Sequence, residues 1–392
     1  MKIEKRIIWE NRSGKKTSWF HPKSTRINGD MLMMTVQGIA GHDYYLPVCE
    51  SLSADLGVNW SLPRPISGMD YREIEHGLTE VISDVVPEYH DATRTVLAMG
   101  HNAYYRNGRL FDTLGLDQKE AMGLRMQRFP IYAIRDVNGC WGVTRRKLEV
   151  PEFSDASCYG CGCSQRVFLC DGKIIIPSVI GYWNRRDMMV TSLLCNFDGK
   201  ELTFLKRGNI LENSVGRGLL EPSVIKFHGK YYMTIRAEDE RGYVSVSDDG
   251  LNWSTIKAWQ WEDGTPLFMS TTQQHWLKLA GELYLVYTRK SRLNTKLFRW
   301  RAPLFIAKFD PVKLCLEKCS EQIVLPMHGN SALPETIGLM GNFHPLAISD
   351  TEAIVLAGEE RSEMGFAGDT LLARICHNGH PRTSAKNSLH TE

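Results

Sequence analysis

The sequence predicts an all-β fold, and more specifically a six-bladed β-propeller. Three observations lead to this prediction. Short β-branched and aromatic runs recur along the chain, Gly, Asn and Asp separate them, and the runs group into sheet-sized units. Sustained helical periodicity is nearly absent, and the best helix candidate is a polar segment around residues 117–127. We therefore expect small antiparallel sheets that close into a ring, which protects their edges.

The strand-like runs divide the chain into six repeats. The clearest runs are residues 31–36, 131–135, 173–178, 230–236, 282–288 and 352–357. They place the blades near 31–64, 86–150, 163–210, 219–258, 270–325 and 340–376. We expect residues 1–378 to form one domain, with an N-terminal strand near 5–10 completing the last blade. The polar, Ser/Thr-rich segment 379–392 is expected to be a flexible tail.

Two turn motifs support the repeat assignment. In the first, residues 53–60 match the pattern Ser-x-Asp-x-Gly-x-x-Trp, with Asp55, Gly57 and Trp60 in the defining positions. The second keeps the core of the pattern as Asp248, Gly250 and Trp253, with Val246 at the Ser position. In such a turn the Asp accepts backbone N–H bonds, Gly supplies an unusual dihedral angle, and Trp packs between strands. The motif therefore indicates a fold rather than a chemistry.

Composition excludes several classes of partner. The 392 residues are 43% hydrophobic and 23% charged, an ordinary globular balance, with a formal net charge of +2. No basic block indicates a nucleic-acid partner, and no apolar run approaches the roughly 18 residues that would span a membrane. The first residues lack the apolar stretch of a signal peptide, so we expect a cytoplasmic protein. Nothing calls for a cofactor, and the oligomeric state stays open.

The ten cysteines fit a reducing compartment. Cys158, Cys161 and Cys163 cluster in a Gly-rich segment, and a zinc site would need a second Cys or His pair at similar spacing. Cys170 is the nearest further cysteine. We expect buried thiols here and no metal.

One acid–base pair stands out from the residues alone. Glu221 and Arg236 lie at opposite ends of a two-strand unit, and a β-hairpin brings its ends together. The two side chains are therefore expected to share one pocket. A guanidinium in such a pocket is suited to bidentate capture of a sugar carboxylate. The alternative is a structural ion pair at the end of a blade.

The two turn motifs together with Glu221 and Arg236 resemble the sialidase superfamily, in a divergent bacterial branch. The resemblance implies an exo-acting glycoside hydrolase on an oligosaccharide or polysaccharide that carries an acidic sugar, either sialic-acid-like or a uronic acid. It also implies a carboxylate-binding set of arginines that includes Arg236, with Arg301 preferred over Arg289 for a further position. Asp43 lies in the loop where the family keeps its acid/base Asp.

The sequence departs from the family at two places. The first-blade Arg is expected beside a proline, but His21 precedes Pro22, so Arg26, Lys23 or the histidine itself would have to serve there. The nucleophilic Tyr of the last blade is missing, because Phe343 occupies the matching stretch. Tyr159 or Tyr287 could supply a phenol from elsewhere in the chain.

Histidines suggest a second mechanism. His21, His101 and His275 are each expected near the end of a blade, and a propeller brings such ends to one central funnel. Histidine is the most common general acid or base. A lyase that cleaves at a uronic acid by His-based β-elimination is therefore an alternative to the hydrolase. A non-catalytic glycan-binding propeller is the third possibility.

Overall fold

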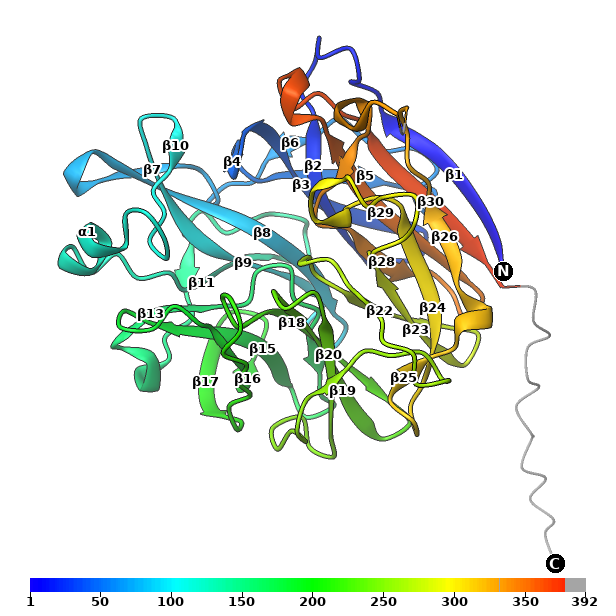
Figure 1. The fold of residues 1–392 in the computed structure, drawn as a ribbon. Coiled ribbons are helices and arrows are strands. Elements are labelled where there is room, and N and C mark those ends of the chain that lie inside the picture. The colour runs from blue at the N-terminus through cyan, green and yellow to red at the C-terminus, as the bar shows by residue number, and fades with distance from the viewer. Residues whose placement is uncertain (331, 378–392) are drawn as a thin grey trace, which may run out of the picture.

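A computed structural model describes residues 1–330 and 332–377, and these residues form six antiparallel sheets arranged around a centre (Figure 1). This arrangement is a six-bladed β-propeller and confirms the predicted fold class. The tail predicted at 379–392 lies outside the described residues. No helix in the described part of the chain is long and apolar enough to cross a membrane.

The first three blades follow the chain in order. Blade 1 contains β2 (Trp19–Asn28), β3 (Met31–Gly41), β4 (Tyr44–Tyr45), β5 (Cys49–Ser53) and β6 (Arg64–Pro65). Blade 2 contains β7 (Arg72–Ile74), β8 (Leu78–His90), β9 (Thr95–Arg106), β10 (Arg109–Leu110), β11 (Pro130–Arg135) and β12 (Arg146–Lys147). Blade 3 contains β13 (Ala156–Gly160), β14 (Val167–Phe168), β15 (Lys173–Tyr182), β16 (Met189–Phe197) and β17 (Leu202–Arg207).

The remaining blades close the ring. Blade 4 contains β18 (Leu219–Phe227), β19 (Lys230–Ala237), β20 (Gly242–Ser247) and β21 (Lys257–Ala258). Blade 5 contains β22 (His275–Leu279), β23 (Glu282–Tyr287), β24 (Leu304–Asp310), β25 (Cys315–Leu316) and β26 (Gln322–Leu325). Blade 6 contains β27 (Leu339–Met340), β28 (His344–Ala347), β29 (Glu352–Glu360), β30 (Thr370–Cys376) and β1 (Lys2–Trp9).

The first and last strands of the described chain pair with each other. β1 runs antiparallel to β30, and Lys2 pairs with Cys376. Figure 1 shows β1 in dark blue along the outer side of β30 in red. The outermost strand of blade 6 therefore comes from the opposite end of the chain to the other strands of that blade.

Helical structure is confined to short segments. The one α-helix among the described residues, α1 (Gln118–Gly123), falls inside the segment predicted at 117–127. The 3-10 turns are η1 (Glu75–Gly77), η2 (Pro151–Phe153), η3 (Phe298–Trp300), η4 (Lys318–Ser320), η5 (Pro334–Thr336) and η6 (Ser362–Met364). Of these, η3, η5 and η6 contribute residues to the cavity described below.

The hydrophobic core is divided among the spaces between neighbouring blades. Blades 2 and 3 bury one cluster that includes Leu97 and Ile176, and blades 5 and 6 bury another that includes Leu304 and Val355. Similar clusters fill the other interfaces between adjacent blades. Because a blade is covered on both faces, its middle strands are apolar on both sides, as in the Ile174–Ile176 run of β15.

Both turn motifs form turns held by a carboxylate, but the second has a different register from the prediction. In the first, Asp55 Oδ1 accepts the backbone N–H of Asn59 at 2.8 Å. In the second, Asp249 rather than Asp248 accepts the N–H groups of Leu251 and Asn252, at 2.8 and 2.7 Å. Asp248 instead points outward to Lys230.

The shift of register also changes the hydroxyl of the second turn. The hydroxyl of Ser247 donates a hydrogen bond to Asp249. Ser247 therefore fills the Ser position of the motif, which the prediction had placed at Val246. Gly57 and Gly250 have φ of 81° and 76°, as these turns require. The indole N–H of Trp60 bonds within its own turn, to Gly57 O, while that of Trp253 reaches Ser192 on blade 3.

The predicted blades begin too late in the first three repeats. Blade 1 begins at Trp19 instead of 31, and blade 2 already contains β8 from Leu78 instead of beginning at 86. Blade 3 begins at Ala156 instead of 163. The strands that the prediction left out lie innermost in their blades and carry polar residues and bulges, which break the alternation that marks a strand.

Candidate functional site

Three innermost strands bulge where they pass the centre of the ring. The register shifts lie between Phe20 and Lys23 in β2, between Ser83 and Val86 in β8, and between Leu220 and Ser223 in β18. A bulge turns a side chain out of the regular alternation of the strand.

The bulged residues are His21, Asp84 and Glu221, and their φ angles are 54°, 56° and 42°. A residue other than glycine in this left-handed region costs about 1–3 kcal/mol, and such strain clusters at functional sites. The sequence supports the geometry at two of the three positions, since Pro follows both His21 and Glu221.

Asp84 is the centre of a buried polar cluster. Its Oδ1 accepts hydrogen bonds from Asn342 Nδ2 at 2.6 Å and from Lys23 Nζ at 3.3 Å, and His21 Nδ1 lies 3.3 Å away. Lys23 is fully buried. Burial opposes ionisation of Asp84, but the charge of Lys23, the neighbouring His21 and His101 and a hydrogen bond with Cys163 together outweigh it and hold the pKa of Asp84 well below its usual value.

The histidines around this cluster are neutral near pH 7. Burial lowers the pKa of both His21 and His101 to about 3. The ring of His21 packs against Tyr45, with ring centroids 4.8 Å apart, and His101 Nε2 lies 3.3 Å from Ser83 Oγ. These imidazoles can donate or accept a hydrogen bond, but they add no positive charge to the site.

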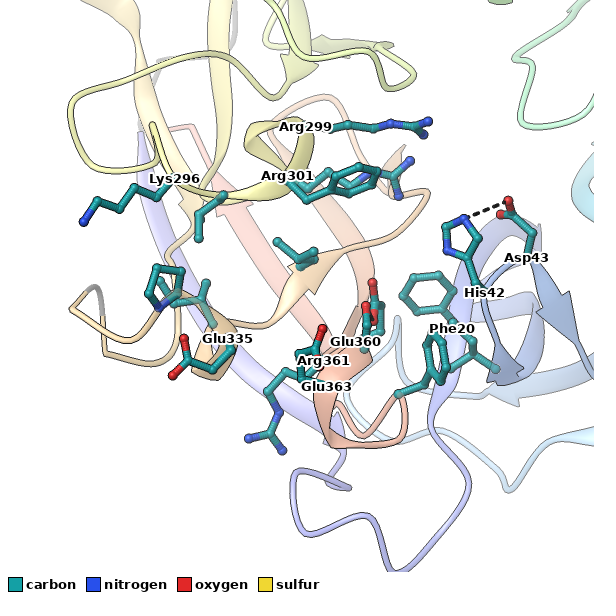
Figure 2. Close-up of a pocket in the computed structure, with 18 of the residues that line it drawn as sticks. Phe20, His42, Asp43, Lys296, Arg299, Arg301, Glu335, Glu360, Arg361 and Glu363 are labelled. Atoms are coloured by element: carbon teal, nitrogen blue, oxygen red, sulfur yellow. Dashed lines mark hydrogen bonds and ion pairs between the residues drawn. The ribbon is translucent and has the colours of Figure 1, made fainter.

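The largest cavity, called the main cavity here, has a volume of about 550 Å³ and lies between blades 1, 5 and 6. Phe20 and Tyr45 contribute aromatic surface from blade 1. Figure 2 shows the side chains of Arg299 and Arg301 extending in the same direction, toward the side where His42 and Asp43 lie, with Glu360 below them. The cavity therefore combines basic side chains, carboxyl groups and an apolar surface; the basic residues are Lys296, Arg299, Arg301 and Arg361, and the acidic ones are Asp43, Glu335, Glu360 and Glu363.

Arg299 and Arg301 have no hydrogen-bond or ion-pair partner for their guanidinium groups among the described residues. Nε of Arg301 is buried without a partner. Burial, followed by the charges of Arg301, Arg236 and Arg217, lowers the pKa of Arg299 to about 10. Two guanidinium groups that repel each other and lack a carboxylate form a site suited to an anion.

Asp43 and Glu360 are two of the four acidic residues that line the main cavity, with Glu335 and Glu363 as the others. Asp43 has φ of 50°, and the Tyr45 hydroxyl donates to its Oδ1 at 3.1 Å. His42 Nε2 lies 3.5 Å from Asp43 Oδ2. Glu360 ends β29 and accepts the Ser362 hydroxyl at 2.9 Å.

A second cavity of about 140 Å³ lies between blades 2, 3 and 4. His101, Arg128 and Arg217 line it together with Glu221 and Arg236. Arg236 Nη1 donates to Glu221 Oε1 at 2.8 Å, so the expected pair exists. The charges of Arg301 in the main cavity and of Arg236 in the second cavity both lower the pKa of Arg299. The structure thus gathers Asp43 and Arg301 in one cavity and Glu221, Arg236 and His101 in the other.

Two predicted arginines lie outside both cavities. Arg289 forms a two-pronged ion pair with Glu321, at 2.7 and 2.6 Å, and packs on the ring of Phe305. Arg26 donates to the backbone oxygens of Gly29 and Ile348, both at 2.6 Å, near the β2–β3 turn. Both guanidinium groups have local structural partners, and the structure therefore gives no support to their assignment to carboxylate binding.

His275 is also in a different environment from the one expected. It is fully buried, its Nδ1 lies 3.1 Å from Ser223 Oγ, and its ring faces Phe343 and His344. It lines neither cavity. A histidine buried in the core is not exposed to a substrate in the cavities, so the structure gives no support to its assignment as a catalytic base.

The two tyrosines considered as sources of a phenol are likewise remote from the cavities. Tyr159 donates its hydroxyl to Leu148 O at 3.1 Å, and Tyr287 donates to Glu321 at 2.5 Å. The phenol that does reach the main cavity belongs to Tyr45, which the sequence analysis did not select.

Sequence reasoning also missed Asp84, Arg299 and Glu360. Ser83 and Asp84 interrupt an otherwise apolar run, residues 81–86, and this interruption is the available signal. Arg299 lies among several basic residues, including Arg292 and Arg301, so its position in the sequence does not single it out. Glu360 directly follows Glu359, which is buried and bonded to Arg12 and His328, so the sequence alone does not distinguish the two roles.

The cysteine cluster lies close to the cavities. Cys158, Cys161 and Cys163 are buried free thiols, and Cys158 lines the second cavity. Cys163 Sγ accepts a hydrogen bond from Asn342 Nδ2 at 2.8 Å. Within residues 1–330 and 332–377, no group of three or more His, Cys, Asp and Glu side chains is arranged to hold a metal ion.

Comparison with solved structures identifies the architecture. The sialidase of Trypanosoma rangeli matches with a TM-score of 0.65 at 13% identity, over 95% of this chain and 59% of that sialidase. A protein of unknown function from Dyadobacter fermentans matches with a TM-score of 0.64 at 11% identity, over 96% and 99% of the two chains. A Hadza microbial sialidase gives a TM-score of 0.62 at 13% identity, over 94% and 68%.

The fold is that of the sialidases. No protein-family model matches this chain, and no curated protein matches its sequence. The chain spans about 59% of the length of the trypanosomal sialidase. The likeness therefore establishes a sialidase-type propeller, while the chemistry has to be argued from the two cavities.

Proposed function

We propose that this protein is an exo-acting glycoside hydrolase for glycans that end in a carboxylated sugar, either sialic-acid-like or a uronic acid. The observation that carries the proposal is the pair Arg299 and Arg301, two guanidinium groups without partners among the described residues, in the same cavity as Asp43 and Glu360. A guanidinium pair recognises a carboxylate, and hydrolysis of a glycosidic bond needs one acid and one base.

The main cavity suits a sugar in size and surface. Its volume of about 550 Å³ lies within the range of small-molecule sites, roughly 300–1,000 Å³. Phe20, Tyr45 and Phe366 offer aromatic surface to the apolar face of a sugar ring. The solved trypanosomal sialidase that shares this fold was captured in complex with sialic acid, which supports the choice of ligand class.

A panel of 4-methylumbelliferyl glycosides tests the proposal. The panel contains N-acetylneuraminic acid, Kdo, glucuronic acid and galacturonic acid, with glucose and galactose as neutral controls. We expect fluorescence from at least one carboxylated glycoside and none from the neutral ones. Arg301→Met should raise KM for the active substrate, and the matched change Arg289→Met, outside the cavity, should not. Absence of turnover across the panel would contradict the hydrolase.

The second cavity supports a second candidate, β-elimination at a uronic acid. His101 is neutral there and lies beside Arg128, Arg217 and Arg236. An arginine would neutralise the uronate and acidify its C5 proton, and His101 would remove that proton as the C4–O bond breaks. Uronate polysaccharides would then yield an unsaturated, ultraviolet-absorbing product, and His101→Ala would abolish it. Glycan binding without either product would indicate the non-catalytic module.

A further inference from the structure

Glu360 lines the main cavity together with three other acidic residues, Asp43, Glu335 and Glu363. It ends β29, pairs across the sheet with Leu339 on β27, and its carboxyl group points upward toward Arg301 in Figure 2. Its hydrogen-bond partner is the Ser362 hydroxyl, which donates at 2.9 Å. No ion pair joins it to a cation among the described residues, whereas Glu359 beside it is bonded to Arg12 at 2.7 Å.

The groups around Glu360 favour a bound proton. Burial raises its pKa, and the nearby carboxylate of Asp43 acts in the same direction. The Ser362 hydroxyl and the positive charges of Arg301 and His42 act in the opposite direction without reversing the shift. Arg361, Glu335 and Glu363 line the same cavity.

Asp43 has the opposite environment. Its side chain is 54% exposed, so water solvates its carboxylate. The Tyr45 hydroxyl donates to it, and His42 lies beside it. Glu360 and Asp43 therefore differ in how far water solvates them. Such a difference between two carboxyl groups of one cavity separates an acid from a base.

We propose that Glu360 is the proton donor of the reaction and that Asp43 is its base. This inference rests on the proposed hydrolase function. It departs from the role that the sequence assigned to Asp43, which was to protonate the leaving oxygen.

The reaction balances with water as the one co-reactant. The Oε–H proton of Glu360 passes to the glycosidic oxygen, the bond from that oxygen to the anomeric carbon breaks, and the electron pair stays on the oxygen of the departing alcohol. Water forms the new bond to the anomeric carbon and loses its proton to Asp43. Asp43 releases that proton to solvent, and Glu360 is reprotonated from solvent.

Substrate binding would reinforce this assignment. A sugar carboxylate held by Arg299 and Arg301 neutralises the charge of Arg301, which is the charge that opposes protonation of Glu360. Binding of the substrate therefore positions the glycosidic bond and also raises the pKa of Glu360.

The test compares leaving groups. Methylumbelliferone departs readily without protonation, whereas methanol does not, so a proton donor matters much more for methyl glycosides. We would measure kcat/KM for both glycosides of N-acetylneuraminic acid, Kdo and glucuronic acid. Glu360→Gln should lose about 10²- to 10⁴-fold on the methyl glycoside and less than about 10-fold on the aryl glycoside. Its pH profile should also lose the limb on which activity falls as the pH rises.

Matched variants separate the possible outcomes. Glu201→Gln, an exposed carboxyl between β16 and β17, should behave as the wild-type protein. A larger loss on the methyl than on the aryl glycoside in Asp43→Asn, and not in Glu360→Gln, would overturn the inference. It would not contradict the proposed hydrolase function. Equal losses on both glycosides in Glu360→Gln, with the pH limb retained, would also overturn it. A wild-type protein that hydrolyses no glycoside would refute the proposed function itself.

A second substitution guards against misfolding. Should Glu360→Gln fail to give the wild-type melting temperature, Glu360→Asp keeps a carboxyl group one methylene farther back. That variant should retain the high-pH limb and show the larger loss on the methyl glycoside. Loss of the limb in Glu360→Asp would count against Glu360 as the donor.

Discussion

Arg236 donates a hydrogen bond from Nη1 to Oε1 of Glu221 at 2.8 Å, and so joins β19 to the bulge of β18 at the wall of the second cavity. Arg236 is nearly buried, and its Nε donates to Thr271 Oγ1 at 2.9 Å. The carboxylate of Glu238 lies farther away, 3.9 Å from Nη2. Glu221 is therefore the main counter-charge of Arg236.

Removal of that carboxylate should destabilise the fold. We expect Glu221→Ala to lower the free energy of unfolding by about 1–3 kcal/mol, because a buried guanidinium loses its nearest counter-charge. Urea denaturation measures the change, with the exposed Glu201→Ala as the control. An unchanged midpoint in Glu221→Ala would show that Thr271 and Glu238 are sufficient for Arg236.

The arginines of blade 5 should separate binding from stability. Arg301→Met should reduce kcat/KM for the carboxylated substrate by roughly 10- to 100-fold, the value of one charge-assisted hydrogen-bonded pair. Its melting temperature should hold or rise, because Arg299 then loses a repulsive neighbour.

Arg289→Met should affect stability and not substrate binding. It should lower stability by about 1–3 kcal/mol, since Glu321 loses its partner, and leave KM unchanged. Steady-state kinetics and thermal melts on the same preparations check both variants. An effect of Arg289→Met on KM would place that residue back at the site.

Acid should destabilise the protein through its buried histidines. Burial lowers the folded-state pKa of His21, His101 and His344 to about 3, against roughly 6.5 in an unfolded chain. Below pH 6.5 the unfolded chain takes up protons that the folded protein does not, so stability present above that pH is lost as the pH falls. At pH 5.5 the three groups together should cost on the order of 4 kcal/mol.

Melting temperatures between pH 7.5 and 5.5 test this expectation. The exposed His76→Asn should keep the wild-type slope, and His344→Asn should flatten it. A melting temperature that is constant over this range would contradict the low pKa values of the buried rings.

The register of the second turn motif predicts different effects for two adjacent substitutions, Asp249→Ala and Asp248→Ala. Asp249→Ala should lower stability by about 1–3 kcal/mol, because two backbone N–H groups and the Ser247 hydroxyl lose their acceptor. Asp248→Ala should change stability by less than about 0.5 kcal/mol, since its pair with Lys230 is exposed. Equal effects of the two substitutions in urea denaturation would return the turn to the register predicted from sequence.

The propeller could be predicted because its signals are local. Apolar runs, turn residues and the motifs around Asp55 and Gly250 each report on a few neighbouring positions. The pair Glu221 and Arg236 was predictable for the same reason, since a single hairpin joins them.

The cavities depend on contacts that the sequence does not display. Asp84 reaches the centre through a bulge in β8, and Lys23 and Asn342 approach it from other blades. His275 begins a strand as predicted, but the side chains around it seal it off. Arg289 has an ion-pair partner, whereas Arg301 has none among the described residues. Packing between distant segments decides this difference.

The pairing of β1 with β30 also bears on how the molecule is made. During translation, residues 2–9 leave the ribosome long before residues 370–376, with which they pair. Blades 1 to 5 can form in order as they emerge, but β1 has no partner strand until β30 is made. A nascent chain halted before β30 would therefore present the unpaired edge of β29 to other proteins.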